Sequence, residues 1–243
     1  MRPLSTPELL DVWERGLSAR PFEQALALLS VASPESSPAA LSRVTIGQRD
    51  TSLFRLREWA FGPELVVQAA CPVCYELLDM VLPVADLCPL GNSAHIPEVS
   101  VCVEDYELRC RLPDSEDLIT CAALEVNLRR QTLFTRCVIE ASYQGEPIGA
   151  EQLPSPVVQA AIDRIAAAEP LADIRIDLTC PACEHRWSEP FDVVSFFWAE
   201  IDAWARRLFR EVHTLASAYG WNESEVLALS PMRRQIYLAM AEI

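Results

Sequence analysis

Two cysteine pairs are the residues of this chain whose types and spacing could do chemistry. Cys71-Pro-Val-Cys74 and Cys180-Pro-Ala-Cys183 share the pattern C-P-x-C. Two thiolates on one tight turn point the same way. Two such turns together supply the four ligands of a tetrahedral zinc site, with Zn–S distances of about 2.3 Å. The repeated motif therefore predicts one Zn²⁺ held by Cys71, Cys74, Cys180 and Cys183.

This zinc is expected to be structural, because four thiolates leave no coordination position for a catalytic water. About 105 residues separate Cys74 from Cys180, so the intervening segment is expected to be an insertion between two halves of the site. Two alternatives stay open. C-P-x-C also occurs in glutaredoxin-like redox sites, where it opens a helix after a strand, and the four cysteines could be unliganded or disulfide-bonded.

The other five cysteines lack partner spacing, and each is expected to be a buried free thiol that packs as a small apolar side chain. They are Cys88, Cys102, Cys110, Cys121 and Cys137. Of these only Cys88 is a plausible substitute ligand. His185, two residues after Cys183, is a second candidate for such a swap.

Composition excludes several other kinds of site. All 20 basic residues are arginine, and the absence of lysine rules out a Walker A loop and a Schiff-base lysine. The seven glycines form no G-x-G-x-x-G, which argues against a dinucleotide site. His95, His185 and His213 are far apart, and the acidic residues at 104–105 and 114–117 have no accompanying nucleophile. We therefore expect a protein that is not an enzyme.

Charge and hydropathy narrow the expected setting. The net charge is −15, whereas nucleic-acid binding needs clustered cations, so no nucleic-acid partner is expected. No apolar run of about 18 residues is free of charge, which predicts no membrane span. Residues 1–20 carry three acidic side chains and no long apolar stretch, unlike a signal peptide. These observations predict a cytoplasmic protein.

The elements that must position the cysteines are read from periodicity and from turn residues. Three segments are predicted: an N-terminal helical segment (1–62), zinc-ribbon halves with a helical insertion (63–189), and a C-terminal helical segment (190–243). The fold class is therefore α+β, mainly helical, with a small zinc-ribbon-like β element formed by two distant C-P-x-C knuckles. Strands are expected at 65–70, 76–82, 99–103, 106–112, 174–179 and 185–188, a proline-containing loop at 83–98, and helices at 113–124, 127–141, 157–168 and 192–219.

Several stretches resemble a known family. Residues 211–221 (EVHTLASAYGW), 225–231 (EVLALSP) and 233–238 (RRQIYL) are similar to the ending of baseplate proteins of contractile phage tails. These include the T-even phage baseplate hub assembly chaperone family and its relatives in phage-tail-like contractile injection systems. Residues 111–118 (RLPDSEDL) resemble the R-L-P-x-x-x-D-L segment of the injection-system members, which also carry both C-P-x-C knuckles. The resemblance spans roughly residue 48 to the end and is strongest from residue 178.

The chain departs from the family at one position of each knuckle. Family knuckles often continue with glycine, where this chain has Tyr75 and Glu184. A knuckle usually needs a positive φ there, which strains a residue that has a Cβ.

The resemblance implies a non-enzymatic assembly factor (chaperone) or minor baseplate component, whose partners are hub or wedge proteins. The C-terminal helices are the expected docking element, with Arg233 and Arg234 available to a partner's acidic groups. The alternative is a thiol–disulfide oxidoreductase that uses one C-P-x-C pair. A zinc-ribbon regulator of transcription is disfavoured by the charge of −15.

Overall fold

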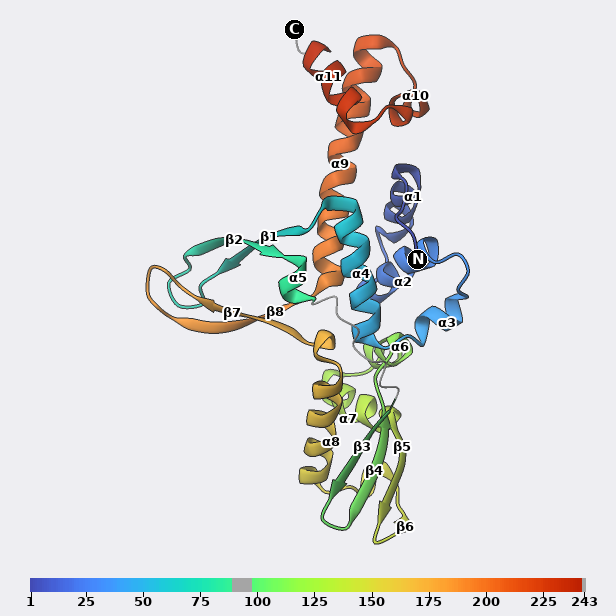
Figure 1. The fold of residues 1–243 in the computed structure, drawn as a ribbon, viewed down its shortest axis with the longest axis vertical. Coiled ribbons are helices and arrows are strands. Elements are labelled where there is room, and N and C mark those ends of the chain that lie inside the picture. The colour runs from blue at the N-terminus through green and yellow to red at the C-terminus, as the bar shows by residue number, and fades with distance from the viewer. Residues whose placement is uncertain (89–97, 242–243) are drawn as a thin grey trace.

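A single long helix organises the molecule. The computed structural model describes residues 1–88 and 98–241, and helix α9 (Val193–Tyr219) runs along its longest axis (Figure 1). The side chain of Asp192 accepts a hydrogen bond from the backbone N–H of Val194 at the first turn, 3.0 Å away. Gly220 ends the helix in the left-handed conformation, with φ of 71°. Both ends of this helix agree with the sequence prediction.

The N-terminal helices pack against the lower half of α9. They are α1 (Thr6–Gly16), α2 (Pro21–Ala32) and α4 (Ile46–Phe61), while the short helix α3 (Pro38–Ser42) packs against α2. Their apolar faces and that of α9 form the main hydrophobic core, which includes Val12, Leu28, Phe54, Phe197 and Ile201. The side chain of Ser37 caps the short helix α3, which begins at Pro38.

Two β-hairpins project from the opposite side of α9 and α4 (Figure 1). The first pairs β1 (Glu64–Ala70) with β2 (Leu77–Pro83), and the second pairs β7 (Ile174–Thr179) with β8 (Arg186–Phe191). All four strands were expected. A short helix, α5 (Val84–Leu87), follows the first hairpin within the segment expected to be a loop. The rest of that loop, with Pro89 and Pro97, lies outside the described residues.

The segment between the hairpins forms a module of its own at one end of the molecule. Strands β3 (Glu98–Val103), β4 (Tyr106–Arg111), β5 (Val138–Tyr143) and β6 (Glu146–Pro147) make an antiparallel sheet in that order. Helix α8 (Ser155–Ala168) packs across β3 and β4, and α7 (Val126–Cys137) packs against β5. The module has its own apolar core, which includes Val99, Leu108, Phe134 and Val157. Helix α6 (Ser115–Ala122) and the single turns η1 (Ala150–Gln152) and η2 (Pro170–Ala172) complete the segment.

Two sequence predictions for this module were wrong. The helix expected over 127–141 stops at Cys137, and Val138 starts strand β5. Pairing with β4 places Ala141 opposite Leu108 in the module core, so tertiary pairing overrides a helical pattern that could have continued. The edge strand β6 pairs with β5 and completes the sheet. The insertion is thus a sheet covered by helices rather than a helical segment.

The remaining helices stand at the far end of α9. They are α10 (Glu223–Ala228), which starts with a capping box formed by Asn222 and Glu225, and α11 (Pro231–Ala241). Helices predominate and strands form small sheets, which confirms the predicted α+β, mainly helical class. Within the described residues, no helix has the length and apolar composition needed to cross a bilayer.

Residues 111–118, the R-L-P-x-x-x-D-L segment, take part in a buried ion-pair network. Both carboxylate oxygens of Asp117 accept hydrogen bonds from Arg111, at 2.6 and 2.7 Å, and one also accepts from Arg136 at 2.7 Å. Asp117 and Asp114 exchange reciprocal bonds through their side chains and backbone N–H groups at the start of α6. The segment therefore joins β4, α6 and α7 around one fully buried carboxylate.

We expect Asp117→Asn to destabilise the protein by about 2–3 kcal/mol at pH 7, the range for hydrogen bonds to charged groups. Burial alone would raise the pKa of Asp117, but its bonds from Arg111, Asp114 and Arg136 lower that pKa below the usual range. Because the pKa of Asp117 is lower in the folded protein than in the unfolded chain, its charged carboxylate adds stability above about pH 4. This stability is lost as the pH falls through the folded-state pKa. Urea unfolding should therefore show a smaller difference between the variant and the parent at pH 3 than at pH 7.

Candidate metal centre

Each C-P-x-C motif lies in the turn of one hairpin. The register pairs Ala70 with Leu77 in the first hairpin and Thr179 with Arg186 in the second, so residues 71–76 and 180–185 are the connecting loops. The two loops have the same length and carry their cysteines at the same places. In glutaredoxin-like sites the motif opens a helix, and neither of these loops is followed by one.

The same two backbone hydrogen bonds shape both loops. The N–H of Cys71 donates to the carbonyl of Glu76, and the N–H of Tyr75 donates to the carbonyl of Cys71, both at 2.9 Å. In the second loop Cys180 donates to His185 at 2.9 Å, and Glu184 donates to Cys180 at 3.0 Å. Each loop thus folds back on its first cysteine and turns the second cysteine toward the same side.

The positions where the family often has glycine adopt the glycine conformation here. Tyr75 has φ of 63° and Glu184 has φ of 60°, both in the left-handed region. This conformation costs a residue with a Cβ about 1–2 kcal/mol. The substitutions therefore leave the knuckle geometry intact, and the strain must be offset by the contacts that hold the two loops.

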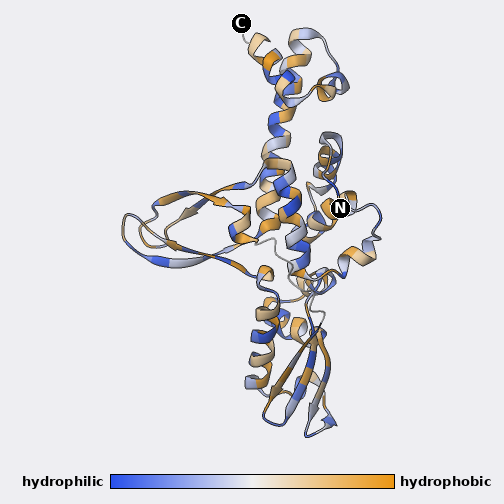
Figure 2. Ribbon diagram, viewed as in Figure 1, coloured by the Kyte–Doolittle hydropathy of each residue, from blue (hydrophilic) through white to orange (hydrophobic). Residues whose placement is uncertain are grey.

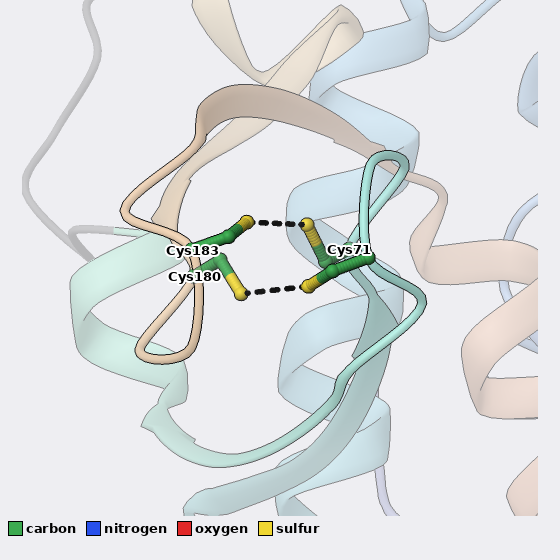
Figure 3. Close-up of side chains that lie close together, drawn as sticks. Cys71, Cys180 and Cys183 are labelled. Carbon is green, nitrogen blue, oxygen red and sulfur yellow. Dashed lines mark hydrogen bonds between the residues drawn. The ribbon is translucent and has the colours of Figure 1, made fainter.

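The four sulfur atoms come together at the place where the two loops meet (Figure 3). Cys71 Sγ lies 3.7 Å from Cys183 Sγ, and Cys74 Sγ lies 3.5 Å from Cys180 Sγ. All four sulfurs lie within 4.8 Å of one another. A tetrahedron with Zn–S distances of about 2.3 Å has edges of about 3.8 Å, whereas a disulfide needs about 2.05 Å. The cysteines are free thiols, and the spacing fits a shared metal ion.

Each close sulfur contact joins one hairpin to the other. The first cysteine of each loop, Cys71 or Cys180, is buried, and the second, Cys74 or Cys183, is exposed. The cluster therefore has an inner side against the protein and an outer side open to solvent, through which an ion can enter. Because residues 71 and 180 are far apart in the chain, an ion bound here would connect the two ends of the inserted module.

The backbone of the loops favours thiolate. Burial acts to raise the pKa of Cys71, but hydrogen bonds from the backbone N–H groups of Cys74 and Val73 outweigh it and lower that pKa to about 6. The backbone N–H of Glu76 likewise lowers the pKa of Cys74, but the neighbouring sulfurs of Cys180, Cys183 and Cys71 raise it to about 12. A cluster of four thiols that begins to ionise in this way needs a cation to ionise completely.

The substitute ligands considered from the sequence do not join the cluster. Cys88 is buried in the main core, and the ring of His185 stacks on Trp187 with the ring centroids 6.1 Å apart. Cys110, Cys121 and Cys137 are buried free thiols, as expected. Cys102 is exposed, so the expectation that it is buried was wrong: it lies on the face of β3 opposite Val99 and Val101, which enter the module core.

Comparison with known proteins gives one match. Residues 34–198 match the family described as T4 bacteriophage base plate protein. The match includes both cysteine pairs and the whole inserted module, but it ends before the C-terminal stretches at 211–238. No curated protein and no solved structure matches the chain. Since the matched region covers most of its length, the chain belongs to the T4 bacteriophage base plate protein family.

Proposed function

We propose that this protein is a non-enzymatic assembly factor, or a minor component, of the baseplate of a contractile phage-tail-like particle. It acts in the cytoplasm on hub or wedge proteins and is stabilised by one structural Zn²⁺ at the cysteine cluster. Membership of the baseplate family carries the proposal. The cysteine cluster supports its metal part, because four free thiols converge there from two distant loops.

The architecture suits a protein that holds several neighbours. Helix α9 has 27 residues, a length of about 40 Å. It carries the helices α10 and α11 at one end, and the hairpins and the inserted module extend from the rest of the molecule in two other directions (Figure 1). Each extension presents a separate surface, so one chain can contact more than one subunit.

The C-terminal helices are anchored to α9 by their inner face. Tyr219, Trp221 and Tyr237 pack together with ring centroids 4.8–5.7 Å apart. The buried Arg234 pairs with Glu211 at 3.0 Å and donates to the carbonyl of Leu229 at 2.8 Å. Arg234 is therefore used internally, which corrects the expectation that it is available to a partner. Arg233 is exposed.

The outer face of α11 is apolar and exposed. Met232, Ile236 and Met240 follow one another at four-residue spacing, so they form one stripe along the helix. Exposed apolar stripes with adaptable methionine side chains are typical of protein-binding helices. We propose that this stripe is the docking element of the C-terminal segment.

Replacing the stripe with glutamine (Met232→Gln, Ile236→Gln and Met240→Gln together) is expected to leave folding unchanged and to lower the yield of contractile particles at least tenfold. The inner contacts of Tyr237 and Arg234 remain, so the melting temperature should stay within about 2 °C. Truncation after Trp221 should have the same effect on particles. Electron microscopy measures the yield of particles, and mass spectrometry of purified particles shows whether they contain this chain. Normal particle yield with the folded triple variant would contradict the docking role.

Metal analysis tests the proposed zinc. Protein purified without added metal is expected to contain one zinc per chain, and Cys74→Ser should lose it because three thiolates bind more weakly than four. Cys102→Ser, which removes an exposed thiol outside the cluster, is the matched control and should keep its zinc. Inductively coupled plasma mass spectrometry measures the content. Two readily titrated thiols per pair, with disulfide-reductase activity, would instead indicate the oxidoreductase.

A further inference from the structure

The first hairpin has an outer face of exposed apolar side chains. Strand β1 alternates, so that Leu65 and Val67 contact the main core while Val66 points away and is 70% exposed. The register places Val66 opposite Val81, which is 58% exposed, and Ala70 opposite Leu77, which is 59% exposed. Side chains directly opposite on one face of an antiparallel pair are in contact. The outer face of this hairpin therefore carries an apolar pair at Val66 and Val81 and another at Ala70 and Leu77, with the polar pair Gln68 and Asp79 between them.

The loop at the tip of the hairpin adds two exposed side chains. Val73 and Tyr75 lie in the loop that carries the cysteines, and Tyr75 is 79% exposed. The hairpin projects from the body of the molecule (Figure 2), and the side chains on its outer face are exposed. A large exposed apolar surface on a soluble protein marks a contact site. We call Val66, Val73, Tyr75, Leu77 and Val81 the hairpin surface.

The charged side chains on the first hairpin itself all have one sign. Glu64, Glu76 and Asp79 lie on the hairpin and Asp86 lies on α5 just after it, and no arginine occurs between Arg57 and Arg109. Asp79 is directly opposite Gln68 on the outer face itself, and its carboxylate accepts a hydrogen bond from that amide at 2.8 Å. The hairpin itself carries no basic residue, so its charge favours a partner of opposite charge.

We infer that the hairpin surface docks onto an apolar patch of another baseplate protein that is bordered by arginine or lysine side chains. The inference rests on the proposed function for the kind of partner and on the charge pattern for its chemistry. A second copy of this chain fits poorly, because a symmetric contact would bring the Asp79 carboxylates of both copies together. A basic partner removes that repulsion and is steered to the surface by opposite charge.

The cysteine cluster would fix the orientation of the docking surface. Cys71 and Cys74 belong to the same loop as Val73 and Tyr75, and the cluster joins this loop to the second hairpin. A two-stranded hairpin alone is only marginally stable. Holding it in place before binding lowers the entropic cost of association, so the bound metal would prepare the hairpin surface for its partner.

Photocrosslinking in cells that produce the particle tests the inference. Benzoylphenylalanine in place of Val81 is expected to crosslink to a baseplate protein, at a peptide that contains arginine or lysine. Ile139 on β5 is also an exposed apolar strand residue, and the same replacement there is the matched control, which should give no such product. The double variant Glu76→Arg/Asp79→Arg should reduce the Val81 product at least tenfold, whereas Asp163→Arg on the exposed face of α8 should not.

Each outcome decides a different point. A Val81 product with a second copy of this chain, with an acidic peptide, or with nothing at all would overturn the inference. An equal yield after the double charge reversal would also overturn it. If these results occur while deletion of the whole chain still abolishes particle assembly, only the hairpin surface is wrong. If deletion leaves assembly intact and the chain is also absent from purified particles, the proposed function itself is wrong.

Discussion

Cys180→Ser is expected to lower the melting temperature by about 10 °C or more and to expose the hairpins to protease. Structural zinc sites in small domains are worth about 10–16 kcal/mol, and even a third of that is a large share of a total stability of about 5–15 kcal/mol. For a chain of this size 1 kcal/mol corresponds to about 2–4 °C. The melting temperature falls because Cys180 is a buried cysteine of the cluster, and a serine in its place would bind zinc far more weakly.

Removing the metal with a chelator and removing a ligand by mutation should have the same effect on the melting temperature. Treating the parent protein with a strong zinc chelator should give the same fall in melting temperature as Cys180→Ser, and the variant should not respond to chelator at all. Cys102→Ser is the control and should melt like the parent, because Cys102 is exposed and outside the cluster. Differential scanning calorimetry with limited proteolysis measures both effects. A parent protein whose melting is unchanged by a chelator that removes all its metal would contradict the structural role.

Glu200→Gln is expected to destabilise the protein by about 3 kcal/mol. Arg57 on α4 is only 2% exposed, and its guanidinium makes two hydrogen bonds to the Glu200 carboxylate on α9, at 2.8 and 2.5 Å, and one to the Gly62 carbonyl at 2.7 Å. Removing the carboxylate charge leaves a buried cation without a counter-ion, which typically costs about 3–5 kcal/mol. We take the lower end because Glu200 is partly exposed.

The double variant separates the charge from the packing. Arg57→Met with Glu200→Leu removes both charges and keeps the apolar volume, so it should recover most of the loss. Arg206→Met is the control: Arg206 pairs with Asp202 at 2.8 Å on the exposed side of the same helix, and it should cost less than about 1 kcal/mol. Urea unfolding at pH 7 measures all four proteins. A Glu200→Gln effect no larger than that of Arg206→Met would show that the pair contributes little.

The parts of the fold that local chemistry determines were predictable. The C-P-x-C loops, the Asn222–Glu225 capping box and the glycine at the end of α9 each depend on a few adjacent residues, and the structure has all three. The convergence of the two cysteine pairs was predicted from their repetition alone. Zinc itself, the absence of enzymatic activity, the cytoplasmic setting and the division into three segments stay predictions.

The parts that depend on distant pairing were not predictable. Strand β5 was expected to be helical. The pairing with β4 that makes it a strand involves residues about 30 positions away, so a local sequence pattern does not show it. The burial of Arg234 depends on Glu211 in another helix. The hairpin surface was missed because the two strands are mostly apolar on both faces, with few polar residues such as Gln68 and Asp79, and only the structure shows which face is exposed.

The long separation of the two cysteine loops has a consequence for biosynthesis. Cys71 and Cys74 leave the ribosome about 105 residues before Cys180 does, an interval of about 5–20 s at ordinary rates of translation. During that time the nascent chain carries two reduced thiols whose partners do not yet exist, while the intervening sheet can already fold. Closure of the cluster is therefore a late, high-contact-order event, and the supply of metal at that moment would set how much of the newly made protein matures.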